Sequence, residues 1–79
     1  MNWQNHIVSD KEVLLGKPTI KGTRISIEHL IGLYAQGWTE AEILANYPRL
    51  TKESMQAVFG YIQDCLHDGL LFTTNRKST

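Results

Sequence analysis

The chain has 79 residues, of which 42% are hydrophobic and 20% are charged, and its eight basic and eight acidic side chains cancel to a formal net charge of zero. This length predicts one small domain, because a second hydrophobic core would leave each half too small to fold alone. The balanced charge argues against a protein that coats nucleic acid through bulk electrostatic attraction. The apolar stretches are too short for a signal peptide or a membrane span, and the single cysteine, Cys65, cannot form an internal disulfide. We therefore expect a cytoplasmic globular domain with no membrane contact.

The first 25 residues contain several turn-forming residues and no helical periodicity. The segment Asp10–Leu15 is a candidate for a single helical turn, because an aspartate can cap it and the glycine that follows can close it. Short pieces rich in β-branched residues predict a small strand-and-loop arm. These pieces are Ile7-Val8, Thr19-Ile20 and Arg24-Ile25.

After the arm, the spacing of apolar residues becomes that of helices. Three helix starts are predicted, each at a serine or threonine that can cap a helix. An apolar residue just before each cap can pack against an apolar residue in the first turns of the helix, which is a hydrophobic staple. Thr39 is followed three residues later by Glu42, which completes a capping box. Gly37 and Pro48 end the first and second helices. The caps are Ser26, Thr39 and Thr51, and the apolar pairs are Ile25 with Leu30, Trp38 with Ile43, and Leu50 with Met55.

The third helix is predicted to be the longest, because one apolar stripe continues along about five turns, to Gly69 or past Phe72. The stripe consists of Met55, Val58, Phe59, Ile62, Cys65, Leu66 and Leu70. The expected fold class is therefore mainly α, as one domain with a three-helix bundle. It divides into a strand and loop arm (residues 1–25), the bundle (residues 26–72) and a frayed polar tail (residues 73–79).

The second helix, the turn after it and the third helix have the order of a helix-turn-helix, in which the later helix enters the major groove of DNA. Residues 37–62, GWTEAEILANYPRLTKESMQAVFGYI, resemble the homeodomain-like helix-turn-helix segments of bacterial regulators. This resemblance implies DNA contacts at the start of the third helix. The candidates are Arg49, Thr51, Lys52 and Gln56. Glu53 repels phosphate in the same segment, so the alternative is a bundle whose polar face is simply solvated.

The arm contains GKPTIKGTR, residues 16–24, which lacks the glycine spacing of a nucleotide-binding P-loop. A backbone nest beside Lys17, Lys21, Thr23 and Arg24 would hold one DNA phosphate or a carboxylate of a partner. The alternative, which we favour, is that the two glycines supply turns with positive φ while Thr23 and Arg24 tie the arm to the bundle.

Neither a metal site nor a catalytic site is predicted. Cys65 and His67 are two residues apart on a helix and point to different sides, and the other histidines offer no ligand pair at a usable spacing. No serine, histidine and carboxylate arrangement has a supporting sequence context. We therefore expect a protein that is not an enzyme and needs no metal or cofactor.

A longer stretch, GKPTIKGTRISIEHLIGLYAQGWTEAEILANYPRLT (residues 16–51), resembles the DUF433 family. The shared pattern is Gly-Lys-Pro followed by Gly-Thr-Arg-Ile, a helix closed by glycine, a Thr-capped short helix, and Tyr-Pro-x-Leu-Thr before the last helix. The resemblance runs from Ile7 to about Tyr61, and it departs from the family pattern at Lys11, where proline is usual, and after Tyr61. It implies the antitoxin half of a prokaryotic type II toxin-antitoxin pair. Together with the helix-turn-helix order, it leads us to expect a homodimer that binds promoter DNA and neutralises a PIN-like or related ribonuclease.

Trp3 and Phe72 lie near the ends of the predicted domain, where a monomer has little core to cover them. Exposed aromatic side chains are favoured anchors of interfaces, so both are candidates for a dimer or toxin surface. The alternative is that both rings simply lie over the bundle. For the protein as a whole, the alternative function is a protein-interaction module that does not bind DNA.

Overall fold

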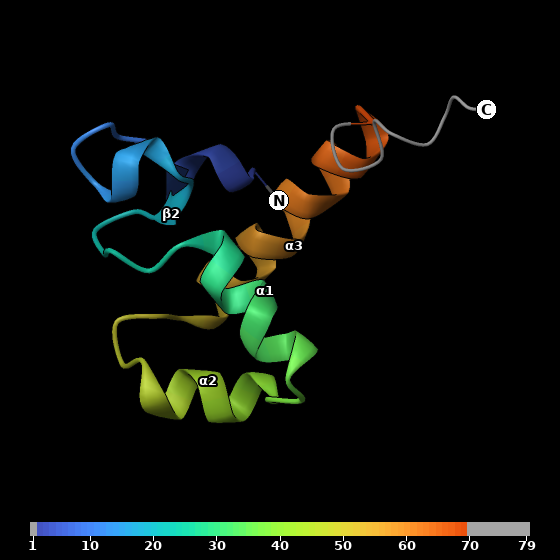
Figure 1. Ribbon diagram of the computed structural model, residues 1–79. Coiled ribbons are helices and arrows are strands. Elements are labelled where there is room, and N and C mark those ends of the chain that lie inside the picture. The colour runs from blue at the N-terminus through green and yellow to red at the C-terminus, as the bar shows by residue number, and fades with distance from the viewer. Residues whose placement is uncertain (1, 70–79) are drawn as a thin grey trace.

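Three α-helices follow a two-stranded N-terminal hairpin in the computed structural model, which describes residues 2–69 (Figure 1). The helices are α1 (Ile27–Ala35), α2 (Glu40–Asn46) and α3 (Lys52–His67). The strands β1 (Ile7–Val8) and β2 (Thr19–Ile20) are accompanied by two 3-10 turns, η1 (Trp3–Asn5) and η2 (Leu14–Gly16). The predicted mainly helical fold with an N-terminal β/loop arm is confirmed. No helix within residues 2–69 is long and apolar enough to cross a membrane.

The three predicted helix starts are confirmed by their hydrogen bonds. Ser26 Oγ accepts from the backbone N–H of His29 at 2.9 Å, and Thr51 Oγ1 accepts from that of Ser54 at 3.1 Å. Ser54 returns the bond by accepting from the Thr51 N–H at 3.2 Å, so α3 also begins with a capping box, with serine in place of the usual glutamate or glutamine. These side chains satisfy backbone donors that have no partner inside the helix.

The capping box of α2 joins Thr39 and Glu42. The Glu42 N–H donates to Thr39 Oγ1 at 3.1 Å, and Glu42 Oε1 accepts from the Thr39 N–H at 2.7 Å and from its hydroxyl at 3.1 Å. These bonds favour the ionised carboxylate and hold the pKa of Glu42 below its ordinary value of 4.5.

Because its pKa is lowered on folding, Glu42 stabilises the fold fully above the unfolded pKa, and this contribution is lost as pH falls through the folded pKa. We expect Glu42→Gln to destabilise the protein more at pH 7 than at pH 3. Urea unfolding of both proteins at the two pH values measures this difference. If Glu42→Gln lowered the free energy of unfolding equally at both pH values, this would contradict a cap that depends on an ionised carboxylate.

The hairpin is antiparallel, with Ile7 opposite Ile20 and Val8 opposite Thr19. On its other side β2 meets the start of α1, since Thr19 bridges to Ser26 and the Ile27 N–H donates to the Pro18 carbonyl at 2.9 Å. The strands contribute side chains to the core, and Ile7, Thr19 and Ile20 are buried. The arm is therefore one layer of the folded unit, packed on the helices by backbone pairing as well as by burial.

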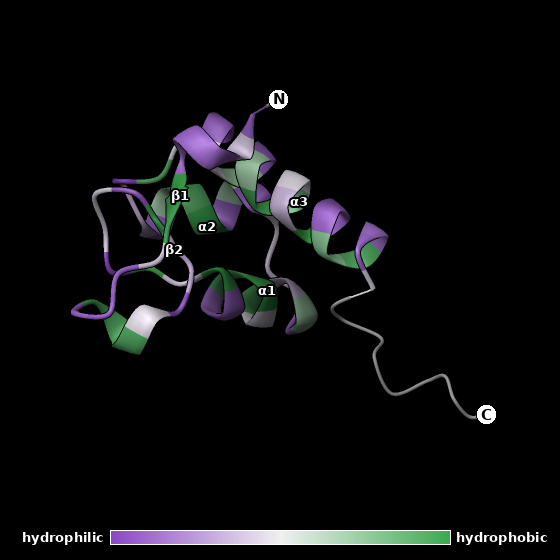
Figure 2. Cartoon of the chain, turned by 90° about the horizontal axis from the view of Figure 1, so that it is seen from above, coloured by the Kyte–Doolittle hydropathy of each residue, from purple (hydrophilic) through white to green (hydrophobic). Residues whose placement is uncertain are grey.

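The core is built from one to three large apolar side chains of each helix together with the hairpin. Figure 2 shows the hydrophobic positions on β1, α1 and α2. The apolar residues that are buried in this cluster are Ile7, Ile20, Ile27, Leu30, Leu33, Ile43, Leu50, Met55, Ala57 and Val58. Leu50 and Met55 form the predicted pair at the start of α3, and both are buried.

The predicted stripe of α3 is correct in part. Met55, Val58 and Cys65 are buried, whereas Phe59 is 49% exposed and Leu66 is 42% exposed. At 100° per residue, seven positions span a wider arc than the neighbouring elements cover, so the residues at its margin face outward. The helix ends at His67 and Gly69 has a φ of +77°, which confirms the predicted stop at this glycine. Leu70 and Phe72 lie outside the described residues.

Candidate functional site

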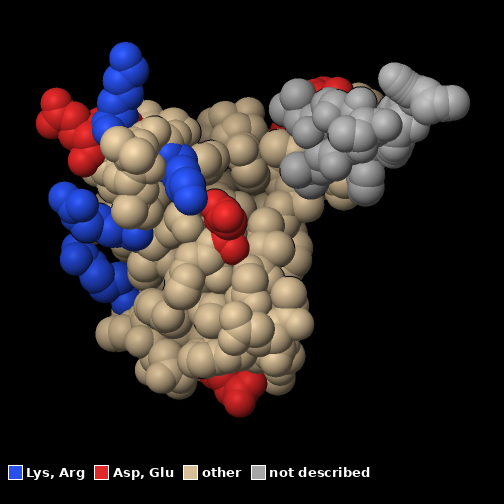
Figure 3. All heavy atoms as spheres, in the orientation of Figure 1, with Lys and Arg blue, Asp and Glu red and all other residues tan. Residues whose placement is uncertain are grey.

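Basic side chains from two distant segments converge on one side of the molecule. Arg24, from the turn after β2, and Arg49, from the connection between α2 and α3, line the same open hollow of about 430 Å³. Lys17 and Arg24 together line a second hollow. We call Lys17, Arg24 and Arg49 the basic edge. Figure 3 shows lysines and arginines gathered along the side that carries the arm and this connection.

The turn that carries Arg24 is fixed by Thr23. Its hydroxyl donates to the Ile20 carbonyl at 2.8 Å and accepts from the Ile25 N–H at 3.0 Å. Gly22 has a φ of +82°, a conformation that favours glycine. Gly16 and Gly22 thus supply the positive-φ turns that the favoured alternative gave them, whereas the Thr23 hydroxyl closes the turn within the arm and leaves the Arg24 side chain exposed.

Arg49 is placed by the way α2 ends. Tyr47 caps the helix through its N–H, which donates to the Ile43 carbonyl at 2.9 Å, and Pro48 cannot continue the helix. The Leu50 N–H then donates to the Tyr47 carbonyl at 2.9 Å, while the Leu50 side chain is buried. Arg49 lies between this turn and the buried Leu50, and its side chain is exposed to solvent.

The predicted DNA-binding residues of α3 lie at its N-terminal end. Lys52 is the first residue of the helix and Gln56 lies one turn later, so both project from the same face, and both are exposed. Thr51 is exposed as well, but its hydroxyl already bonds to Ser54. Arg49, Lys52 and Gln56 are thus the candidates whose side chains are directed to solvent without a capping role.

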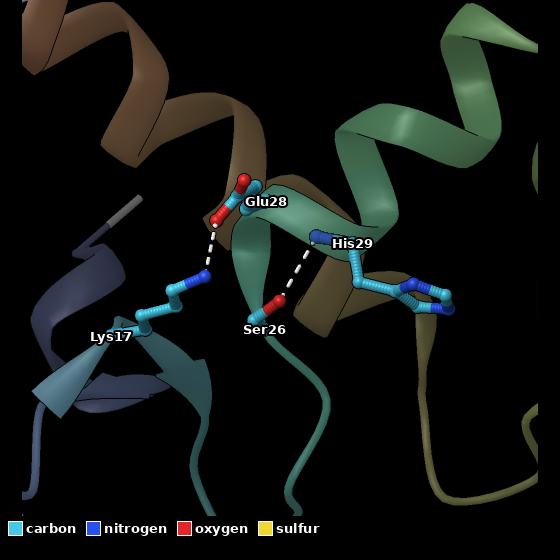
Figure 4. Close-up of polar contacts among 4 residues, drawn as sticks. All are labelled: Lys17, Ser26, Glu28 and His29. Carbon is cyan, nitrogen blue, oxygen red and sulfur yellow. Dashed lines mark hydrogen bonds and ion pairs between the residues drawn. The ribbon is translucent and has the colours of Figure 1, made fainter. Parts of the chain in front are cut away.

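Lys17 is engaged by α1. Its Nζ lies 3.0 Å from Glu28 Oε1, and both side chains are exposed (Figure 4). This is the one ion pair within residues 2–69, and an exposed pair of this kind contributes little to stability. The Lys21 backbone N–H donates to the His6 carbonyl at 2.8 Å and its side chain is exposed. The candidates of the arm therefore differ in their pairing. Lys17 forms an ion pair with Glu28, whereas Arg24 has no carboxylate partner among the described residues.

Trp3 is placed by α3. Its ring packs edge-on against Tyr61, with ring centroids 5.0 Å apart, and its Nε1–H donates to Asp64 Oδ2 at 2.6 Å. Trp3 is half-buried by this contact, as in the alternative in which it lies over the bundle. An interface role for Trp3 stays a prediction, and Phe72 lies outside the described residues.

One feature beside the basic edge carried no sequence signal. His29 Nε2 and the Tyr47 hydroxyl lie 3.0 Å apart, although the two residues belong to α1 and to the end of α2. Their rings are perpendicular, with centroids 5.9 Å apart. Tyr47 opens the Tyr-Pro-x-Leu-Thr pattern, but nothing in the sequence links it to His29, and only the packing of the two helices brings them together. Within the described part of the chain, no three His, Cys, Asp or Glu side chains gather as metal ligands would.

Comparison with known proteins places these residues in a described family. A family model, "Protein of unknown function (DUF433)", matches residues 7–62. Among solved structures, the chain is similar to the crystal structure of a DUF433 member protein from Anabaena variabilis ATCC 29413, with 35% sequence identity and a TM-score of 0.75. The match covers 82% of this chain and 64% of that chain, so this chain spans less than two thirds of the related protein. No curated protein matches this chain.

Proposed function

This chain belongs to the DUF433 family of proteins of unknown function, and from this membership and its geometry we propose that it is an antitoxin-like regulator that binds promoter DNA. In this proposal α3 enters the major groove, with Lys52 and Gln56 at base edges or phosphates. Arg49 and the arm contact the flanking backbone. A nuclease-type toxin, PIN-like or a related ribonuclease, is the proposed protein partner.

The observation that carries the DNA-binding proposal is the convergence of Arg24 and Arg49 on one hollow, whose lining contains two cations and one carboxylate, that of Asp10. The chain has no excess of positive charge, so affinity for phosphate has to come from a local arrangement of cations. Residues that are 25 positions apart in sequence supply that arrangement beside the N-terminal end of α3. Phosphate contacts of this kind fix the register of the helix in the groove.

The proposed DNA-bound form is a homodimer. Helix-turn-helix dimers bind two half-sites whose centres are about 34–36 Å apart, and the symmetry of the DNA matches that of the protein. A single copy presents few cations, so two copies on adjacent half-sites double the number of phosphate contacts. The expected operator is therefore an inverted repeat.

Fluorescence anisotropy of the purified chain with DNA from upstream of its gene, beside a shuffled duplex, tests this function. We expect selective binding that weakens steeply as salt is raised. The second candidate, a protein-interaction module that does not bind DNA, is favoured by Glu53, which is exposed in the first turn of α3. Absence of selective binding would favour this module.

Glu53 also supplies a test with the opposite sign. We expect Glu53→Gln to tighten binding to both the promoter and the shuffled duplex by a few-fold, because it removes a negative charge next to Lys52 on the DNA-facing end of α3. The matched control is Asp68→Asn, which removes an exposed carboxylate at the other end of α3. Equal effects of the two variants would show that the start of α3 does not face DNA.

A further inference from the structure

A hollow of about 610 Å³ lies between η2, the start of α1 and the end of α2. Its lining is mostly apolar, from Leu14, Leu15 and Ile25, and the rings of His29 and Tyr47 form part of its wall. Arg24 is the unpaired cation of this lining, because Lys17 is paired with Glu28. An apolar surface with one available guanidinium fits an apolar group that carries a negative charge.

The two leucines that line the hollow have a costly conformation. Leu14 has a φ of 51° and Leu15 a φ of 58°, a left-handed region that residues with a Cβ rarely adopt. Leu15 is also 93% exposed. An exposed leucine in a strained turn gains no burial within residues 2–69, and strained backbone of this kind is concentrated at binding sites. Burial against a partner would supply the missing contact.

We propose that this hollow binds an extended segment of a partner protein in which a large apolar side chain adjoins an aspartate or glutamate. The apolar side chain packs on Leu14, Leu15 and Ile25, and the carboxylate pairs with Arg24. The Tyr47 hydroxyl, held by His29 at 3.0 Å, lies where it can bond to the main chain of the segment. The inference goes beyond the proposed function, because it requires neither DNA binding by α3 nor a nuclease as the partner.

Charge selects this occupant over a segment of the chain itself. Residues 70–79 carry Arg76 and Lys77 and no acidic residue, so their charge is the same as that of Arg24. In both overall views α3 also ends on the side of the molecule away from η2 (Figures 1 and 2). An acidic, apolar segment of another protein complements the hollow in both charge and hydrophobicity.

Amide NMR shifts of the full chain, titrated with three short synthetic peptides, test the proposal. The first peptide alternates Leu or Phe with Asp or Glu, the second replaces its acids with Lys, and the third replaces its apolar residues with Ser. We expect only the first to shift the amides of Ile25, His29 and Tyr47 saturably at millimolar concentration. No shift with the first peptide, or an equal response to the second, would overturn the proposal.

Two variants separate binding from folding. Leu15→Gly fits the left-handed backbone, so we expect an unchanged or raised Tm and peptide binding that is weaker by about 10-fold or more. Arg24→Gln is expected to lower the affinity for the first peptide several-fold. Leu66→Ser, at an exposed leucine of α3, is expected to leave this affinity unchanged. Unchanged peptide binding by Leu15→Gly would overturn the assigned site.

Two further measurements identify other occupants. Concentration-dependent sedimentation that Leu15→Gly abolishes would assign the hollow to a second copy and overturn the proposal. Shifts of residues 70–79 on Leu15→Gly substitution would assign it to the tail, with the same consequence. Arg49→Gln combined with Lys52→Gln is expected to bind the peptide normally. A failure of the DNA-binding proposal is thereby distinguished from a failure of this one.

Discussion

Neutralising Arg49 and Lys52 together, as Arg49→Gln with Lys52→Gln, is expected to weaken promoter binding by roughly 10- to 100-fold at about 0.1 M salt. Each lost phosphate contact lowers the slope of log affinity against log salt by about one, so the double variant loses about two. Both side chains are exposed, and Lys52 is a cation at the N-terminus of α3, where the helix dipole disfavours it. The fold should therefore survive, which circular dichroism can verify.

A control with the same change in net charge separates local contacts from bulk charge. Gln36→Glu with Gln63→Glu also lowers the net charge by two, at exposed positions just after α1 and in α3, neither of which lines the hollow shared by Arg24 and Arg49. We expect a small loss of DNA affinity and an almost unchanged salt slope. Equal losses in the two double variants would mean that Arg49 and Lys52 do not contact phosphate.

Replacement of Leu30 by alanine is expected to lower the free energy of unfolding by about 2–5 kcal/mol, as measured by urea unfolding followed by circular dichroism. Leu30 is fully buried in α1, within the cluster that includes Ile43 and Met55. Truncation removes apolar area and leaves a cavity that the surrounding elements fill only in part. A domain of this size has a marginal core, so a loss of this magnitude removes much of its stability.

Leu66→Ala is the matched control, because it makes the same chemical change at a side chain that is 42% exposed. We expect a loss below about 1 kcal/mol, since little apolar surface is transferred to water and no closed cavity forms. Equal losses at Leu30 and Leu66 would contradict the placement of the core between α1, α2 and α3.

The helical part of the fold could be predicted because its signals are local. Thr39 and Glu42 are three residues apart and form their capping box within one turn, and Leu50 and Met55 are equally close. These pairs depend on helix geometry alone, so the sequence is sufficient to place the helix starts. The 3-10 turn η1 escaped prediction because Trp3 is held there by Asp64, which lies 61 positions away.

The candidate site could be predicted only in its residue types. The sequence predicts Arg24 beside a backbone nest and Arg49 as a DNA contact, but their convergence depends on how the hairpin packs beside the α2–α3 connection. The left-handed conformation of Leu14 and Leu15 is contrary to the preference of leucine, so local propensity argues against it. Tertiary packing decides where Arg24 and Arg49 meet, and sequence spacing carries no information about it.

The bond between Trp3 and Asp64 also has a consequence for the order in which the protein is made. The ribosome releases the N-terminal arm first, yet Asp64 and Tyr61, which hold η1, emerge almost last among the described residues. A contact over this sequence separation closes late, because most of the chain must be in place before it can form. The 3-10 turn η1 therefore docks only after synthesis of α3, when nearly the whole domain has left the exit tunnel.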